Sequence, residues 1–161
     1  MIRALAILLA APAAADTPLP LAADWQRTHP GGVVAEGTLD PPQIRITAPG
    51  ATPWALGFWL QPHTIHPSPD GEYVLVSNAG GNILSAGFES DDAVLWIYQR
   101  PGGEEIAQVP LGILARRGAL EQTASGFVWI DSYIWAVDGW AFETPDGQGW
   151  HLSTDLRLER R

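Results

Sequence analysis

Two copies of one four-residue turn constrain this chain more than any other local feature. The first is S-P-D-G at 68–71, and the second is T-P-D-G at 144–147. Proline presets φ at the second position of a turn, aspartate suits the third, and glycine accepts the left-handed conformation that follows. Runs rich in β-branched or aromatic residues flank the turns, at 73–77, 140–143 and 150–153. The pattern predicts two hairpins that each close through a type I turn and a bulge.

Other short runs alternate between apolar and polar residues and predict further strands. The chain contains 8 Trp, 17 Gly and 14 Pro, which is typical of many short strands separated by turns. Residues 111–121 alone look helical, and their two glycines each cost about 1 kcal/mol relative to alanine. We therefore predict an all-β antiparallel meander with at most one short helix. Strands are expected at 43–48, 54–60, 93–99, 105–109, 127–130, 133–137 and 150–158, after a loosely structured arm at 16–42 with one strand near 32–37.

The first fifteen residues follow the pattern of a secretory signal peptide. An apolar run at 4–11 is followed by an A-x-A site that predicts cleavage between Ala15 and Asp16. A membrane anchor needs about 20 apolar residues, more than this run offers. A hydrophobic first helix is the other alternative, and Pro12 disfavours it. The sequence predicts a periplasmic or secreted protein with no membrane insertion after cleavage and a single all-β domain at 16–161.

Composition argues against several kinds of partner and chemistry. The chain has 18 acidic against 9 basic residues and a formal net charge of −9, whereas nucleic-acid binding relies on clustered Lys and Arg. It contains neither Cys nor Lys, which excludes thiol nucleophiles, thiolate metal sites and Schiff-base chemistry. The sequence also lacks a nucleophile elbow and a zinc-protease motif. No catalytic residue and no cofactor is therefore expected.

Residues 65–111 carry a resemblance to a known architecture. S-P-D-G is followed by Y-V-L-V-S, then by D-D-A-V-L-W-I-Y, a P-G-G turn and a closing strand. This order resembles one blade of a WD40-like or related β-propeller. The stretch 65–158, with D-S-Y-I-W at 131–135, is also similar to small secreted bacterial proteins of unknown function. The resemblance implies propeller-blade-like sheets and brings no activity with it.

Two groups of side chains have metal-ligand chemistry. His63 and His66 form an H-x-x-H, and Asp70 follows closely, so an imidazole-accepting metal is one hypothesis. On a strand, positions i and i+3 point to opposite faces, so convergence requires a loop. The alternative is that these are polar edge residues beside a turn. An acidic run, formed by Glu89, Asp91 and Asp92, offers oxygen ligands for calcium or is a solvated loop.

The tryptophans suggest a surface for a ligand or partner. Exposed aromatic rings stack on sugars and anchor interfaces. The pairs Trp54 with Trp59 and Trp135 with Trp140 are the candidates for ligand binding. The alternative is that these rings fill the core between sheets.

Two functions from different classes remain. The first is a non-catalytic binding or partner-interaction module, which export and the missing catalytic motifs favour. Its partner is an unknown protein or small molecule, and an open sheet edge would also allow a homodimer. The second is a small metal-dependent hydrolase that uses His63, His66 and Asp70.

Overall fold

The computed structural model describes residues 21–79, 82–116, 118, 120–124, 126–130, 132–136 and 138–161. The predicted leader and its cleavage point, Ala15 and Asp16, lie outside these residues. Antiparallel strands in four sheets dominate the described chain, with one short α-helix. The predicted all-β antiparallel meander is thus confirmed. No helix in this part of the chain has the length and apolarity to cross a membrane.

The first two strands of the first sheet lie where the sequence predicted a loosely structured arm with one strand, and the other two lie where strands were expected at 43–48 and 54–60. Alternation is clear there: Val33, Ala35 and Gly37 are buried, while the residues between them stay partly exposed. Ile46 of the neighbouring strand lies opposite Ala35 and is also buried. Small buried residues give a weak hydrophobic signal, although the face they form is fully packed. The strands are β1 (Trp25–Thr28), β2 (Val34–Leu39), β3 (Pro42–Thr47) and β4 (Trp54–Leu56), with the 3-10 turn η1 (Pro30–Gly32) between β1 and β2.

The second sheet is packed on both faces. Val74 and Val76 contact the core of the first sheet, whereas Leu75 between them belongs to a second core. Successive side chains on a strand point to opposite faces, so burial on both faces requires the continuous apolar run seen in Y-V-L-V-S. The order is β5-β6-β8-β9, with β5 (Ile65–Pro67), β6 (Tyr73–Ser77), β8 (Ala93–Gln99) and β9 (Glu104–Pro110). The 3-10 turn η2 (Pro62–Thr64) precedes β5.

The chain between β9 and the C-terminal strands is short and irregular. The helix α1 (Leu111–Leu114) ends well before residue 121, where the helical pattern ended. Leu111 and Leu114 are buried, and the exposed Gly118 that follows α1 weakens any extension. A small sheet of order β10-β11-β7 follows, with β7 (Ile83–Ser85), β10 (Glu121–Gln122) and β11 (Gly126–Val128).

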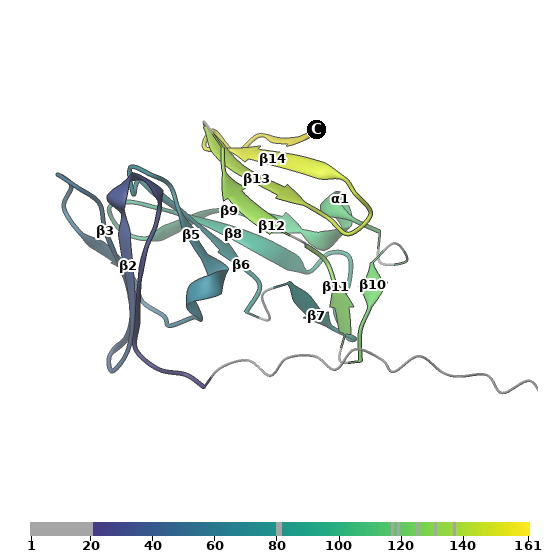
Figure 1. The fold of residues 1–161 in the computed structure, drawn as a ribbon, viewed down its shortest axis with the longest axis horizontal. Coiled ribbons are helices and arrows are strands. Elements are labelled where there is room, and N and C mark those ends of the chain that lie inside the picture. Colours follow the sequence, from purple (N-terminus) through teal and green to yellow (C-terminus); the bar gives the residue numbers. More distant parts are fainter. Residues whose placement is uncertain are drawn as a thin grey trace, which may run out of the picture.

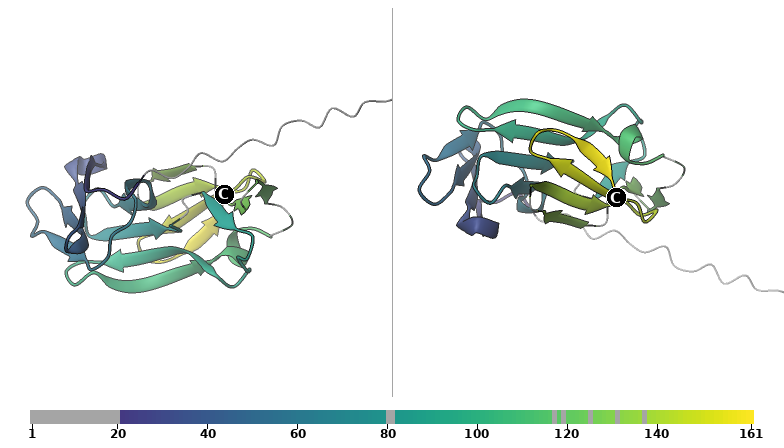
Figure 2. Two further views of the ribbon diagram at one scale, coloured as in Figure 1. Left: turned by 90° about the horizontal axis from the view of Figure 1, so that it is seen from below. Right: turned by 90° about the horizontal axis from the view of Figure 1, so that it is seen from above.

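The last sheet contains the second P-D-G turn and packs against the second sheet. Its strands form a simple antiparallel meander: β12 (Ser132–Trp135), β13 (Gly139–Glu143), β14 (Gly149–Ser153) and β15 (Leu158–Arg160). Trp140, Phe142 and Leu152 join Leu75 and Ile97 of the second sheet in one core. Figure 1 shows the first sheet at the opposite end from β14, and both views of Figure 2 keep the last two large sheets as neighbouring layers.

The two P-D-G turns give a matched test of packing at a left-handed glycine. Gly71 has φ of 67° and Gly147 has φ of 74°. A Cβ on Gly71 would lie 2.7 Å from the Cβ of Ala48, whereas a Cβ on Gly147 would meet nothing within 4 Å. We expect Gly147→Ala to cost about 1–2 kcal/mol of unfolding free energy, from backbone strain alone.

Gly71→Ala carries that strain together with a steric conflict in the first core, which adds about 1–3 kcal/mol. Urea denaturation of both variants measures the difference. Equal losses in the two variants would contradict the close packing of the first turn against β3.

Candidate functional site

A cleft of about 350 Å³ lies where three segments that are distant in sequence meet. One wall comes from the hairpin formed by β1 and η1, the floor from β5, and the opposite wall from β12 and β13. The walls are largely apolar and aromatic, which is typical of small-molecule sites. The lining residues are Arg27, His29 and Pro30 from the hairpin, His66 and Pro67 from β5, and Tyr133, Trp135 and Trp140 from the last sheet.

Trp140 anchors the last sheet to β5. Its indole N–H donates a hydrogen bond of 2.8 Å to the carbonyl oxygen of His66. Only 1% of Trp140 is exposed, so its ring is part of the core as well as a wall of the cleft. Trp135 lies opposite Trp140 in the β12–β13 register and meets it edge to face, with ring centroids 5.1 Å apart. Trp135 remains partly exposed and offers its surface to the cleft.

His66 is held in the cleft by an aromatic stack. Its imidazole lies against the ring of Tyr133, with centroids 4.2 Å apart and an angle of 28° between the planes. His66 keeps some exposed surface as a residue, but its Nε2 is enclosed and has no hydrogen-bond partner among the described residues. Burial lowers the pKa of His66 to about 3, with further lowering from the charges of His29, Arg27 and His63. The imidazole is therefore neutral at pH 7.

His29 reaches the same cleft because the hairpin tip packs closely on the first P-D-G turn. A Cβ at Gly31 would lie 2.1 Å from the carbonyl oxygen of Pro69, so only glycine permits this approach. Burial lowers the pKa of His29 to about 4, and the charge of Arg27 lowers it further. Its Nε2 is enclosed and, within the described chain, has no protein partner. The sequence analysis did not select His29, although H-P-G-G is a recognisable turn.

Tyr133 completes the polar floor. Its hydroxyl is enclosed and lies beside the buried hydroxyl of Ser77. Burial raises the pKa of Tyr133 well above its usual range, and the nearby Ser77 hydroxyl offsets part of the rise. Tyr133 and both imidazoles are thus neutral near pH 7. Among the described residues that line the cleft, Arg27 carries the charge.

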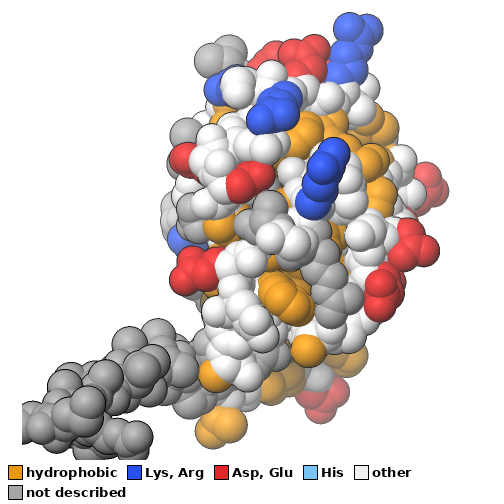
Figure 3. All heavy atoms as spheres, turned by 90° about the vertical axis from the view of Figure 1, so that its right-hand side faces the viewer, with side chains coloured by type: hydrophobic (Ala, Val, Ile, Leu, Met, Phe, Trp, Pro, Cys, Tyr) orange, Lys and Arg blue, Asp and Glu red, His pale blue; other side chains and the backbone are white. Residues whose placement is uncertain are grey.

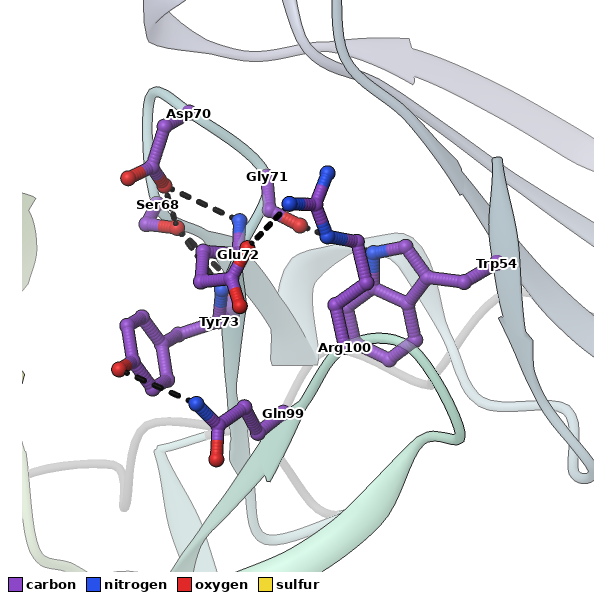
Figure 4. A network of polar contacts seen from close by, with 8 residues as sticks. All are labelled: Trp54, Ser68, Asp70, Gly71, Glu72, Tyr73, Gln99 and Arg100. Carbon is purple, nitrogen blue, oxygen red and sulfur yellow. Dashed lines mark hydrogen bonds and ion pairs between the residues drawn. The ribbon is translucent and has the colours of Figure 1, made fainter. Parts of the chain in front are cut away.

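Asp70, a predicted metal ligand, has a structural role in its own turn (Figure 4). Its carboxylate accepts a hydrogen bond of 2.6 Å from the Ser68 hydroxyl and one of 3.0 Å from the backbone N–H of Glu72. Burial opposes ionisation of Asp70, but these hydrogen bonds and the charge of Arg100 outweigh it, so the pKa lies below its ordinary value. The second turn repeats the arrangement, with Thr144 donating to Asp146 at 2.7 Å.

The structure brings His66 into one cleft with His29, while Asp70 serves its turn. His63 lies in η2, and burial together with the charge of Arg27 lowers its pKa. Within the described part of the chain, no three His, Asp or Glu side chains come together as a metal site. In the acidic loop proposed for calcium, Asp92 accepts a hydrogen bond of 2.7 Å from the backbone N–H of Glu89.

In the other tryptophan pair, Trp54 is buried and Trp59 is partly exposed. Trp54 is 6% exposed and belongs to the core of the first sheet. Its indole N–H donates a hydrogen bond of 2.8 Å to the carbonyl oxygen of Gly71, which Figure 4 also shows. Trp59 lies beyond the end of β4, because the expected strand at 54–60 stops at Leu56. Trp54 thus follows the core alternative, and so does most of Trp140, whereas Trp135 is partly exposed in the cleft.

A second hollow of about 400 Å³ lies beside α1, β14 and β15. Arg116 and Arg160 line it together with Trp150, and so does the carboxylate of Asp146. Figure 3 shows this side of the molecule, where hydrophobic side chains reach the surface between basic ones. The hollow is more open than the aromatic cleft and mixes charges of both signs, so it defines a ligand less sharply.

Comparisons with protein families, with curated proteins and with solved structures found no match to this chain.

Proposed function

We propose that the protein is an exported, non-catalytic binding module that holds a small ligand in the aromatic cleft. One observation carries this proposal: two residues that line the cleft, His29 and His66, each have an enclosed imidazole nitrogen without a hydrogen-bond partner among the described residues. A buried polar atom that lacks a hydrogen bond costs about 1–3 kcal/mol. Two such nitrogens in residues that line one cleft are expected where a ligand supplies the missing partners.

The ionisation of the cleft favours binding over catalysis. A general acid or base works best when its pKa lies near the operating pH. The pKa values of His29 and His66, about 4 and about 3, make both imidazoles weak bases at pH 7. Two neutral imidazoles still donate and accept hydrogen bonds, which suits recognition of a ligand.

The size and walls of the cleft indicate a ligand with a single ring. Small-molecule sites range from about 300 to 1,000 Å³, and this cleft of about 350 Å³ lies near the lower limit. Trp135 supplies a partly exposed aromatic face, and Pro30 and Pro67 add apolar surface. Aromatic faces favour flat partners such as aromatic or sugar rings.

The test is a titration of the protein with five ring compounds: phenol, indole, D-glucose, benzoate and D-glucuronate. Nuclear magnetic resonance of the tryptophan indole N–H groups and the histidine rings reports binding. We expect at least one compound to shift the signals of Trp135 and His66. Trp135→Ala should raise its Kd about tenfold, because an aromatic contact is worth about 0.5–1.5 kcal/mol in addition to buried area.

The matched control is Trp150→Ala, which removes a partly exposed tryptophan from the second hollow. It should leave binding unchanged. Failure of all five compounds to shift the cleft signals, or loss of binding in Trp150→Ala alone, would overturn the assignment of this cleft.

A further inference from the structure

The cleft differs in charge from the rest of the molecule. The chain as a whole has a formal net charge of −9. Of the described residues that line the cleft, none is acidic, and Arg27 is the single charged side chain. Arg27 lines the cleft with His29 and His66, and its charge contributes to the lowered pKa of both. A positive cleft on an acidic protein attracts one local negative charge and repels polyanions elsewhere.

The polar groups around Arg27 have the chemistry that recognises a carboxylate. The guanidinium binds a carboxylate through two parallel N–H donors. A neutral imidazole adds one donor, and His66 has an enclosed Nε2 without a hydrogen-bond partner in the described chain. These groups lie beside the aromatic wall formed by Trp135 and Trp140. The cleft therefore combines groups that bind a negative charge with an aromatic wall on which a ring can stack.

We propose that the ligand of the cleft is a single ring that bears one carboxylate. Its ring packs against Trp135, and its carboxylate pairs with Arg27 and takes further hydrogen bonds from the floor. This rests on the proposed function and adds the chemical class of the ligand. A single guanidinium balances one negative charge, which favours a monocarboxylate over a phosphate monoester. An aromatic acid and a sugar acid share this chemistry.

Two matched pairs of probes test the carboxylate. Benzoate is compared with benzyl alcohol, and D-glucuronate with D-glucose, so that each pair keeps its ring and changes the charge. We expect the acid in at least one pair to bind with a Kd at least about tenfold lower, since a hydrogen bond to a charged group is worth about 1.5–3 kcal/mol. The pair that shows the difference identifies the ring as aromatic or sugar.

The matched variants are Arg27→Gln and Arg45→Gln. Both remove one exposed arginine from the first sheet, but Arg45 lies on the polar surface of β3 beside Glu36 and away from the cleft. Arg27→Gln should raise the Kd of the acid about tenfold and leave the neutral partner unchanged. Arg45→Gln should change neither.

The outcomes separate this inference from the proposed function. Equal affinity of acid and alcohol, with shifts of the cleft signals in both, would overturn the carboxylate and leave a binding module. An equal effect of the two arginine variants would show that overall charge, and not Arg27, attracts the acid. Absence of any binding in the four probes and in the earlier panel would overturn both proposals.

Discussion

Trp140→Ala is expected to lower the free energy of unfolding by about 3–5 kcal/mol, the usual cost of truncating a buried aromatic side chain. Trp140 is 1% exposed and belongs to the core between the second and last sheets. Its removal also leaves the carbonyl oxygen of His66 without the indole N–H that it accepts at 2.8 Å. Domains have a total stability of about 5–15 kcal/mol, so the variant should denature at a much lower urea concentration.

Two further variants divide this effect into its parts. Trp140→Phe keeps most of the ring but loses the donor to His66, and should cost about 1–3 kcal/mol. Ile113→Ala removes a side chain that is 54% exposed on α1 and should change stability by less than about 0.5 kcal/mol. If Trp140→Ala were as mild as Ile113→Ala, the last sheet would not pack on β5 through this residue.

The second large effect is a loss of stability in mild acid. His66 has a pKa of about 3 in the folded protein, below the ordinary value of 6.5 that applies when the chain is unfolded. Between these values the unfolded state binds the proton and the folded state does not, so stability is greatest above pH 6.5 and falls as the pH decreases. At pH 4.5 the loss from His66 is on the order of 3 kcal/mol. His29, with a pKa of about 4, adds to it.

The groups that face His66 determine which variants test this prediction. Arg27, His29 and His63 all oppose its protonation, and neutral Tyr133 covers one face of the ring. Asp70 does not contribute in this range, because a lowered carboxyl pKa costs stability only as the pH falls towards and below about 3.8.

His66→Gln should therefore be less stable than the original protein at pH 7.5, where it loses the stack on Tyr133, yet lose less stability between pH 7.5 and 4.5. Urea denaturation at several pH values measures how the free energy of unfolding changes with pH in the variant and in the original protein. His63→Gln, which removes a less enclosed imidazole, serves as the control and should keep most of the acid sensitivity. If the free energy of unfolding changed with pH in His66→Gln and in His29→Gln as it does in the original protein, the two imidazoles would not be buried and neutral in the cleft.

Local signals predicted the hairpins well, because a turn depends mainly on the residues within it. S-P-D-G and T-P-D-G both form the expected turns, with glycine at positive φ and an aspartate that accepts the side-chain hydroxyl at the start of the turn. The continuous apolar run in β6 also indicates from the sequence alone that both faces of this strand are buried. Within the first sheet, strands were expected near 32–37, at 43–48 and at 54–60, and β1 alone had no such signal, because three of its four residues are exposed.

The candidate site was predicted only in part. Trp135 and Trp140 were selected as an aromatic pair, and their adjacency follows from the β12–β13 register. His66 was selected for a metal site with His63 and Asp70, but the structure places its ring in the cleft beside Tyr133. Arg27 had no local signal, because it belongs to no motif with a known chemistry. A search for isolated histidines beside glycine turns would have found His29.

The sequence by itself determined which residues turn, which alternate along strands, and that the fold is all-β, since these properties depend on neighbours along the chain. Only the tertiary structure decided that one cleft is lined by Arg27, His29 and Pro30, by His66 and Pro67, and by Tyr133, Trp135 and Trp140. That meeting depends on contacts between segments far apart in sequence: the closely packed Gly31 on the first turn, and the bond from Trp140 to His66. Such contacts arise from the shapes and polar groups of packed surfaces, which no local pattern of residues encodes.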